Sequence, residues 1–186
     1  MPLPTATASR EPLHRWSIQV LGFRRADGLY DIEARLVDIK SVDFQLASGV
    51  RPAGQPIHDM ALRITVDASL TIVEAAASTD AMPYPGECQR ITPHYAALVG
   101  LAIRPGFTSK VRALFGGTAG CTHLTDLIGA AATIAFQTVA GQAPPLPDRK
   151  PYQLDRCHAL KTDAPAVAQF YPQWYRTAAQ ETAEAS

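Results

Sequence analysis

The feature that most constrains the fold is a long apolar helix pattern that begins directly after a glycine-rich segment. Apolar residues recur at helical spacing over residues 122–140, which predicts one long amphipathic helix. Three glycines lie within residues 116–120, and glycine is favoured where the backbone needs a positive φ or a close approach. Cys121 and His123 fall at the expected helix start, where free N–H groups and the helix dipole favour a thiolate.

The first half of the chain alternates between apolar and polar residues, as antiparallel strands do. Residues 16–23 and 30–38 alternate on either side of Asp27-Gly28, and Asp-Gly is a hairpin turn signal. Residues 62–67 and 70–77 repeat this pattern. We therefore expect an α+β fold, with an antiparallel sheet from the N-terminal half and the helices of the C-terminal half packed on one face.

Composition limits the classes of function. The 186 residues, 47% of them hydrophobic, suit a single α+β domain over residues 13–176, with flexible tails at 1–12 and 178–186. The 17 basic and 17 acidic residues balance, which argues against a nucleic-acid partner. No apolar run approaches about 18 residues, and the N-terminus lacks a signal-peptide pattern, so we expect neither a membrane partner nor secretion. Three cysteines make no disulfide framework, which favours the cytoplasm.

Several thiols and imidazoles stand beside a glycine, a proline or the end of an expected element, where side chains converge at the rim of a sheet. A soft thiolate and an imidazole together suit zinc or iron. No Cys-x-x-Cys or His-x-x-x-His pair occurs, so the spacing is not that of a zinc finger. We expect a metal site at the sheet rim whose ligands are Asp59, Cys88 and Cys121, with His58 or His123 completing the shell.

Three functions stay open at this point. The first is a metal-binding domain that holds or transfers iron or zinc. The second is an enzyme acting on a small molecule, either through a metal-activated water or through Cys121 as a nucleophile with His58 or His123 as base and Asp59 as the orienting acid. The third is a metal-free binding module in which the cysteines are core residues. The oligomeric state, and whether Cys157 and His158 join the site, are left open.

Four segments together resemble an uncharacterised bacterial family, the domain of unknown function DUF2889. They are residues 27–34, His58-Asp59-Met60, residues 116–124 and residues 157–160. The resemblance covers residues 15–176 and implies no activity.

The order of ligand types along residues 56–140 also resembles the iron–sulfur scaffold proteins of the NifU and IscU type. Asp59, Cys88 and Cys121 are the matching positions. The pattern departs from that family where Ile57 replaces a cysteine and where Gly120 replaces a histidine. The resemblance implies a short antiparallel sheet with helices on one face, and it leaves open a mononuclear site of mixed nitrogen, sulfur and oxygen ligands.

Overall fold

The computed structural model describes residues 2–142 and 148–177. The chain divides into two compact units, Met1–Val139 and Ala140–Ser186, and each is described here by itself. The single domain expected over residues 13–176 stays a prediction. The tail expected at 178–186 and the connector at 143–147 lie outside the described residues.

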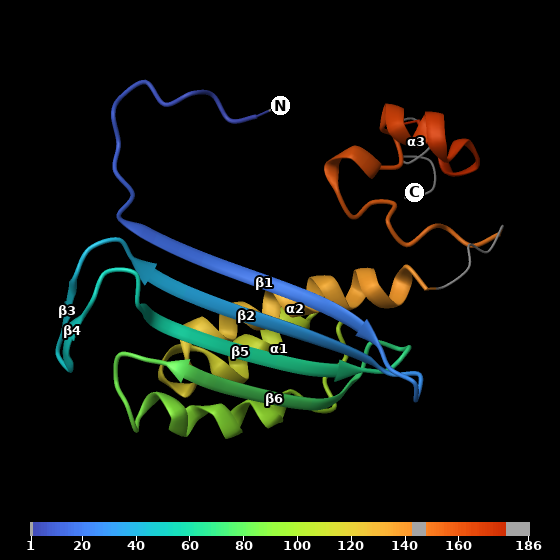
Figure 1. Ribbon diagram of the computed structural model, residues 1–186. Helices are drawn as coiled ribbons and strands as arrows, with labels where there is room; N and C mark the ends of the chain where they lie inside the picture. Colours follow the sequence, from blue (N-terminus) through green and yellow to red (C-terminus); the bar gives the residue numbers. More distant parts are fainter. Residues whose placement is uncertain (1, 143–147, 178–186) are drawn as a thin grey trace. The chain divides into compact units, whose positions relative to one another are not determined.

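The first unit is built on a four-stranded antiparallel sheet in the order β1-β2-β5-β6 (Figure 1). The predicted first hairpin is confirmed, because Gly28 turns the chain at a φ of 86° between β1 and β2. The second predicted pair is confirmed as β5 and β6. The bounds of the strands are β1 (His14–Arg24), β2 (Tyr30–Lys40), β5 (Pro56–Val66) and β6 (Ile72–Ala81).

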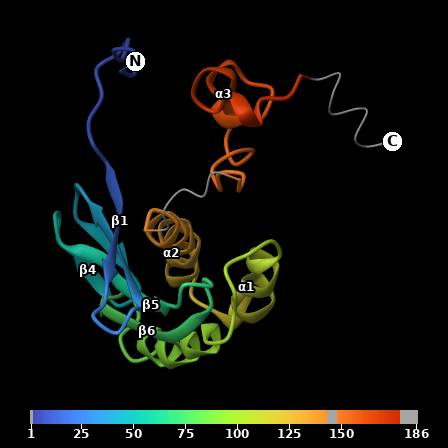
Figure 2. The ribbon, with the colours of Figure 1, turned by 90° about the vertical axis from the view of Figure 1, so that its right-hand side faces the viewer.

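Helices cover one face of this sheet, as the α+β prediction requires. Figure 2 shows α1 (Phe107–Phe115) and α2 (Thr122–Ala140) on the same side of the strands. The bounds predicted for the long helix are confirmed. At Gly22 on β1, an added Cβ would lie 2.3 Å from Thr138 Oγ1 of α2, so strand and helix touch closely there. The strand residues buried on this face include Ile32, Ala34, Leu36, Met60, Leu62 and Ile64.

Two local predictions are wrong. The two glycines and two prolines of residues 47–57 predict a loop, but this segment contains β4 (Gly49–Arg51), which pairs with β3 (Phe44–Leu46), and β5 already begins at Pro56. Thr92-Pro93 is typical of the first residues of a helix, but the helical segment begins at Cys88, as the 3₁₀ segment η1 (Cys88–Leu98) with Pro93 inside it. A 3₁₀ segment has i→i+3 hydrogen bonds and three residues per turn. The start signals of an α-helix and its 3.6-residue spacing therefore do not locate where such a segment begins.

The glycine-rich segment contains η2 (Gly117–Ala119), and it needs glycine for both of the expected reasons. Gly117 has a φ of 60°. At Gly120, a Cβ would lie 2.5 Å from the carbonyl oxygen of Phe115. The chain therefore passes close to the end of α1 immediately before α2 begins.

The second unit contains η3 (His158–Leu160), α3 (Pro165–Phe170) and η4 (Pro172–Trp174). The run Asp163-Ala164-Pro165 predicts a helix start, and α3 begins there at Pro165. Asp155 links two segments of this unit, because its carboxylate accepts hydrogen bonds from both the backbone N–H and the hydroxyl of Thr162. Within the part of the chain that is described, no helix combines the length and the apolar character needed to cross a bilayer.

Candidate metal centre

Polar side chains meet at the end of the sheet where β1 and β5 begin and β2 ends. Trp16 lies opposite Asp38 in the β1–β2 register, and Asp38 lies opposite His58 in the β2–β5 register. Side chains at such paired positions share one face of a sheet. This is the face that the helices cover, because Asp38 is two residues beyond the buried Leu36 on the same strand.

Asp38 is hydrogen bonded to two other members of this group. Its Oδ2 lies 2.9 Å from His58 Nδ1, and its Oδ1 is hydrogen bonded to His14 Nε2. The side chain of Asp38 is only 7% exposed. Burial opposes ionisation of this carboxyl, but the hydrogen bonds from His58 and His14 outweigh it and hold the pKa of Asp38 below its usual value. Asp38 is therefore a buried carboxylate with two imidazole partners.

The second residue of α2 brings another imidazole to Asp38 and His58. The His123 ring stacks on His58 with 3.7 Å between ring centroids and on Trp16 with 5.1 Å. Burial, followed by the neighbouring charge of His58, lowers the pKa of His123. His123 is thus held in the neutral form, which is the form that binds a metal ion.

Three of these side chains have the spacing of a metal-ligand set. Asp38, His58 and His123 each offer one ligand atom, and the three atoms lie within 4.8 Å of one another. The Nδ1 of His58 faces a carboxylate oxygen of Asp38 at 2.9 Å, so an ion held by both residues would take the place of the proton in that hydrogen bond. A carboxylate has about four lone-pair sites, so the two hydrogen bonds of Asp38 leave it able to act as a ligand. These three residues are called the Asp38 cluster below.

Cys121 lies beside the Asp38 cluster, at the N-cap position of α2. Its Sγ is 3.8 Å from His123 Nδ1 and 3.8 Å from the Sδ of Met60. Its carbonyl accepts the first helical hydrogen bond, from the N–H of Thr125. The thiol therefore contacts one member of the cluster, on the side of His123 that carries Nδ1.

A buried tyrosine fixes the backbone at this helix start. The hydroxyl of Tyr95 accepts a hydrogen bond from the N–H of Cys121 at 2.9 Å and lies 3.0 Å from the carbonyl oxygen of the same residue. The Tyr95 ring is fully buried and stacks on Phe115 at the end of α1. Helix η1, which carries Tyr95, and helix α1 thereby set where Cys121 and His123 stand.

Among the five ligands predicted from the sequence, the structure brings three together and places two elsewhere. His58, Cys121 and His123 converge at the end of the sheet. Asp59 lies on the opposite face, where its two carboxylate oxygens pair with Arg35 at 2.7 and 2.6 Å. Cys88 begins η1, after the far edge strand β6, and does not belong to the Asp38 cluster.

The separation of His58 from Asp59 has a simple cause. The alternating pattern begins at residue 62 and leaves both residues before the strand, whereas β5 begins at Pro56 and includes both. Successive residues of a strand point to opposite faces, so the two cannot serve one site.

Sequence reasoning missed Asp38, His14 and Trp16. A signal for Asp38 was present, because it continues the inward positions Ile32, Ala34 and Leu36 of an alternating strand. A carboxylate in an apolar position needs partners. Nothing in the sequence identifies His14 and His58 as those partners, since they lie 24 and 20 residues from Asp38 along the chain.

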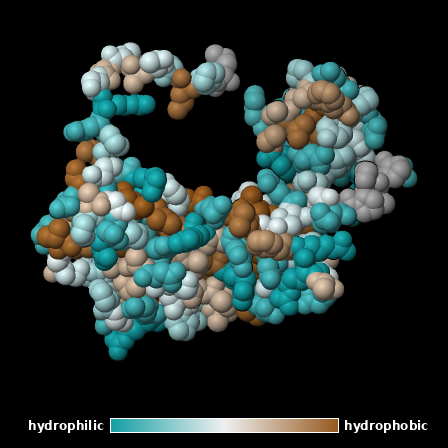
Figure 3. Space-filling view, in the orientation of Figure 1, coloured by the Kyte–Doolittle hydropathy of each residue, from teal (hydrophilic) through white to brown (hydrophobic). Residues whose placement is uncertain are grey.

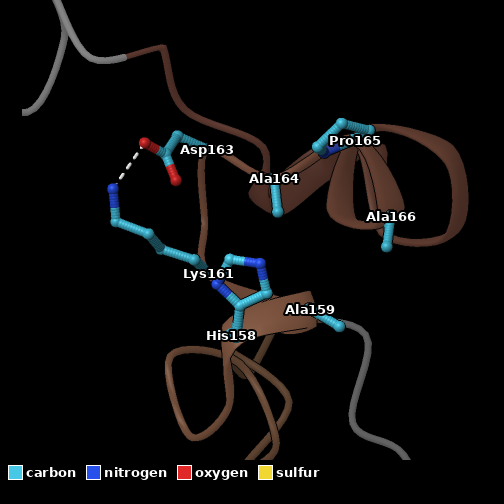
Figure 4. Close-up of a pocket in the computed structure, with 7 residues that line it drawn as sticks. All are labelled: His158, Ala159, Lys161, Asp163, Ala164, Pro165 and Ala166. Atoms are coloured by element: carbon cyan, nitrogen blue, oxygen red, sulfur yellow. Dashed lines mark hydrogen bonds and ion pairs between the residues drawn. The ribbon is translucent and has the colours of Figure 1, made fainter.

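Two further surface features are a set of exposed apolar residues on β1 and a pocket in the second unit. Figure 3 shows apolar areas on the first unit, and Trp16, Ile18, Leu21 and Phe23 of β1 are exposed. A pocket in the second unit is lined by His158, Lys161, Asp163 and Pro165, among others (Figure 4). Lys161 pairs there with Asp163 at 2.6 Å, and no residue of the Asp38 cluster lines this pocket.

Comparison with known proteins found one match. The search of curated proteins gave none, and the search of solved structures gave none, so neither supports the resemblance to NifU and IscU. A family model described as "Protein of unknown function (DUF2889)" matches residues 14–137, a range that contains every member of the Asp38 cluster together with His14 and Cys121. Because this match covers well over half of the chain, the protein belongs to the DUF2889 family.

Proposed function

We propose that this protein is a metal-binding domain that holds one iron or zinc ion at the Asp38 cluster. The observation that carries the proposal is the presence of three ligand atoms, from Asp38, His58 and His123, within 4.8 Å of one another. Two imidazoles and one carboxylate are donors that both metals accept. A resident ion would supply a Lewis acid at the rim of the sheet.

The state of each donor supports the proposal. The lowered pKa of Asp38 keeps it ionised and the lowered pKa of His123 keeps it neutral, and both are the forms that bind metal. The Nδ1 of His58 and a carboxylate oxygen of Asp38 are 2.9 Å apart, so two of the three donors already face each other across the space that an ion would occupy.

A thiol-dependent enzyme acting on a small molecule is the second candidate. The observation that favours it is the 3.8 Å separation of Cys121 Sγ and His123 Nδ1, since a nucleophilic cysteine needs a neighbouring base. The N-cap position adds the positive end of a 19-residue helix. The reducing cytoplasm expected from the sequence would keep this thiol free.

Metal analysis of untagged protein, purified without added metal or chelator, tests the first candidate. We expect close to one equivalent of iron or zinc per chain, and its loss in His58→Gln and His123→Gln. His94→Gln is the matched control, because His94 is an exposed histidine outside the Asp38 cluster that contacts the carbonyl of Leu114 and the ring of Phe115. A metal-free wild-type protein after anaerobic purification, or equal metal content in all variants, would rule the proposal out.

Thiol alkylation separates the two candidates. If the protein is metal-free, a cysteine-dependent enzyme requires Cys121 to react with iodoacetamide at least as fast as the exposed Cys157, despite its partial burial. Slow alkylation that only a denaturant accelerates would identify Cys121 as a core residue and exclude the second candidate.

A further inference from the structure

We infer that an ion at the Asp38 cluster keeps an open coordination position and that this position takes a small anion. The inference rests on the proposed function and extends it from holding a metal to binding a ligand on the metal. Four features support it, namely the number of donors, the engagement of the neighbouring polar groups, the access of solvent and the net charge.

The number of donors is too small for a closed site. Structural zinc sites have four protein ligands, whereas the residues described here bring only three ligand atoms within 4.8 Å. Three protein ligands are the usual number at catalytic zinc, and two histidines with one carboxylate are typical of non-haem iron(II) with free positions. On either metal, this donor set leaves coordination sites for an exogenous molecule.

The two nearest further donors are engaged with the ligands themselves. His14 Nε2 is hydrogen bonded to Asp38 Oδ1. Cys121 Sγ lies beside His123 Nδ1 and Met60 Sδ. Groups that hydrogen bond to a metal ligand orient it and tune its basicity. We therefore assign His14 and Cys121 as positioning residues, for Asp38 and His123 respectively, and not as the fourth ligand.

Solvent reaches the cluster from the side of β1. The side chain of His14 is 38% exposed and that of His58 is 13% exposed. Trp16, which stacks on His123, is 41% exposed. A small molecule can therefore approach along the edge strand without displacing the apolar core, which lies further along the sheet.

The charge of the loaded site favours an anion. A divalent ion with one carboxylate and two neutral imidazoles carries a net charge of about +1, and the bound ion is the largest local charge in such a site. An anionic donor neutralises that charge in a largely buried position, where a charge interaction is screened less than in water. The class of ligand expected is thus a small anion, such as hydroxide or the carboxylate of a substrate.

Cobalt(II) and azide test this inference on the full-length protein. Cobalt(II) reports its coordination through its visible absorption, and azide is a small anion that binds metal. We expect one equivalent of cobalt to bind and azide to shift the cobalt absorption in a saturable manner. Cys121→Ser should weaken cobalt binding by about tenfold or more, as loss of an orienting partner does, while the azide response persists. His94→Gln should match the wild type in both titrations.

The possible results separate failure of the open coordination position from failure of metal binding itself. A cobalt spectrum that azide does not change, with a thiolate-to-cobalt charge-transfer band that Cys121→Ser abolishes, would show that Cys121 fills the fourth position. That result would overturn the open site and leave the metal-binding function intact. Failure of the wild-type protein to bind cobalt, zinc or iron would overturn both.

Discussion

Two side-chain pairs that differ by one residue along β5 show how strongly the face of a sheet determines the role of a side chain. His58 pairs with Asp38 on the face covered by helices, and Asp59 pairs with Arg35 on the other face. The Asp38 and His58 side chains are 7% and 13% exposed, whereas in the other pair Asp59 is 13% exposed and Arg35 is 58% exposed. Both pairs join β2 to β5, so their environment is the main difference.

The two environments have different energetic consequences. Because the Arg35 guanidinium is exposed, water and salt screen its interaction with Asp59, and such pairs contribute about 0–1 kcal/mol. Asp38 and His58 are largely removed from water, so loss of one partner leaves the other without compensation. The buried pair is therefore the one that can keep reactive groups in fixed positions.

The largest effect is expected from Asp38→Ala. We expect the free energy of unfolding to fall by about 3 kcal/mol, because His58 loses a buried acceptor and His14 loses its partner. Urea denaturation followed by circular dichroism measures it. Asp59→Ala, one position from His58 on the opposite face, is the matched control and should cost less than about 1 kcal/mol. Equal losses in the two variants would contradict the comparison.

A smaller effect is expected from Tyr95→Phe. This variant tests whether the stability of the helix-covered face depends on the hydrogen bond that holds the start of α2. Removing the hydroxyl leaves the N–H of Cys121 without its acceptor, which should lower the free energy of unfolding by about 2 kcal/mol. The exposed Tyr84 supplies the control Tyr84→Phe, which we expect to be neutral. An unchanged unfolding midpoint in Tyr95→Phe would show that other contacts fix this helix start.

Asp155 is a third carboxylate with hydrogen-bond partners, and its side chain is 40% exposed. Its hydrogen bonds from Lys150 and Thr162 lower its pKa from 3.8 to about 2. Because the folded pKa is depressed, the stabilisation from this carboxylate is complete above about pH 4 and is lost as the pH falls through about 2. NMR titration of the Asp155 carboxyl should show this midpoint, and Thr162→Val should raise it. A midpoint near 3.8 in the wild type would contradict the hydrogen-bond assignment.

The smallest effect is expected from Arg35→Ala. The exposed guanidinium makes a bidentate pair with Asp59, and we expect its removal to cost less than about 1 kcal/mol, with a smaller difference at high salt. Metal content should not change, because this pair lies on the face away from the Asp38 cluster. Loss of metal in this variant would show that the two faces are coupled.

Much of the fold follows from local patterns in the sequence. The hairpin at Asp27-Gly28 and the helix over residues 122–140 were predictable because turn chemistry and helical spacing are local signals. The β3–β4 hairpin was not, since each of its strands has only three residues, too few to show alternation. The start of β5 was also missed, and with it the opposite directions of His58 and Asp59.

The candidate site was predictable in part. Cys121 and His123 stand out because they follow a glycine-rich segment at a helix start, and this placement is confirmed. Asp38 could have been noticed as a carboxylate in an inward-facing strand position. Its pairing with both His14 and His58 depends on the registers of two strand pairs, which no local pattern specifies.

Local patterns in the sequence specify the long strands, the long helix and the apolar face of each, because alternation and helical spacing are properties of neighbouring residues. Which polar groups meet depends on the packing of these elements in three dimensions. His14, Asp38, His58 and His123 come from β1, β2, β5 and α2, and they converge because strand register aligns the first three and the Tyr95 hydroxyl anchors the start of α2 beside them. Convergence of this kind depends on long-range packing, in which each contact joins residues far apart along the chain.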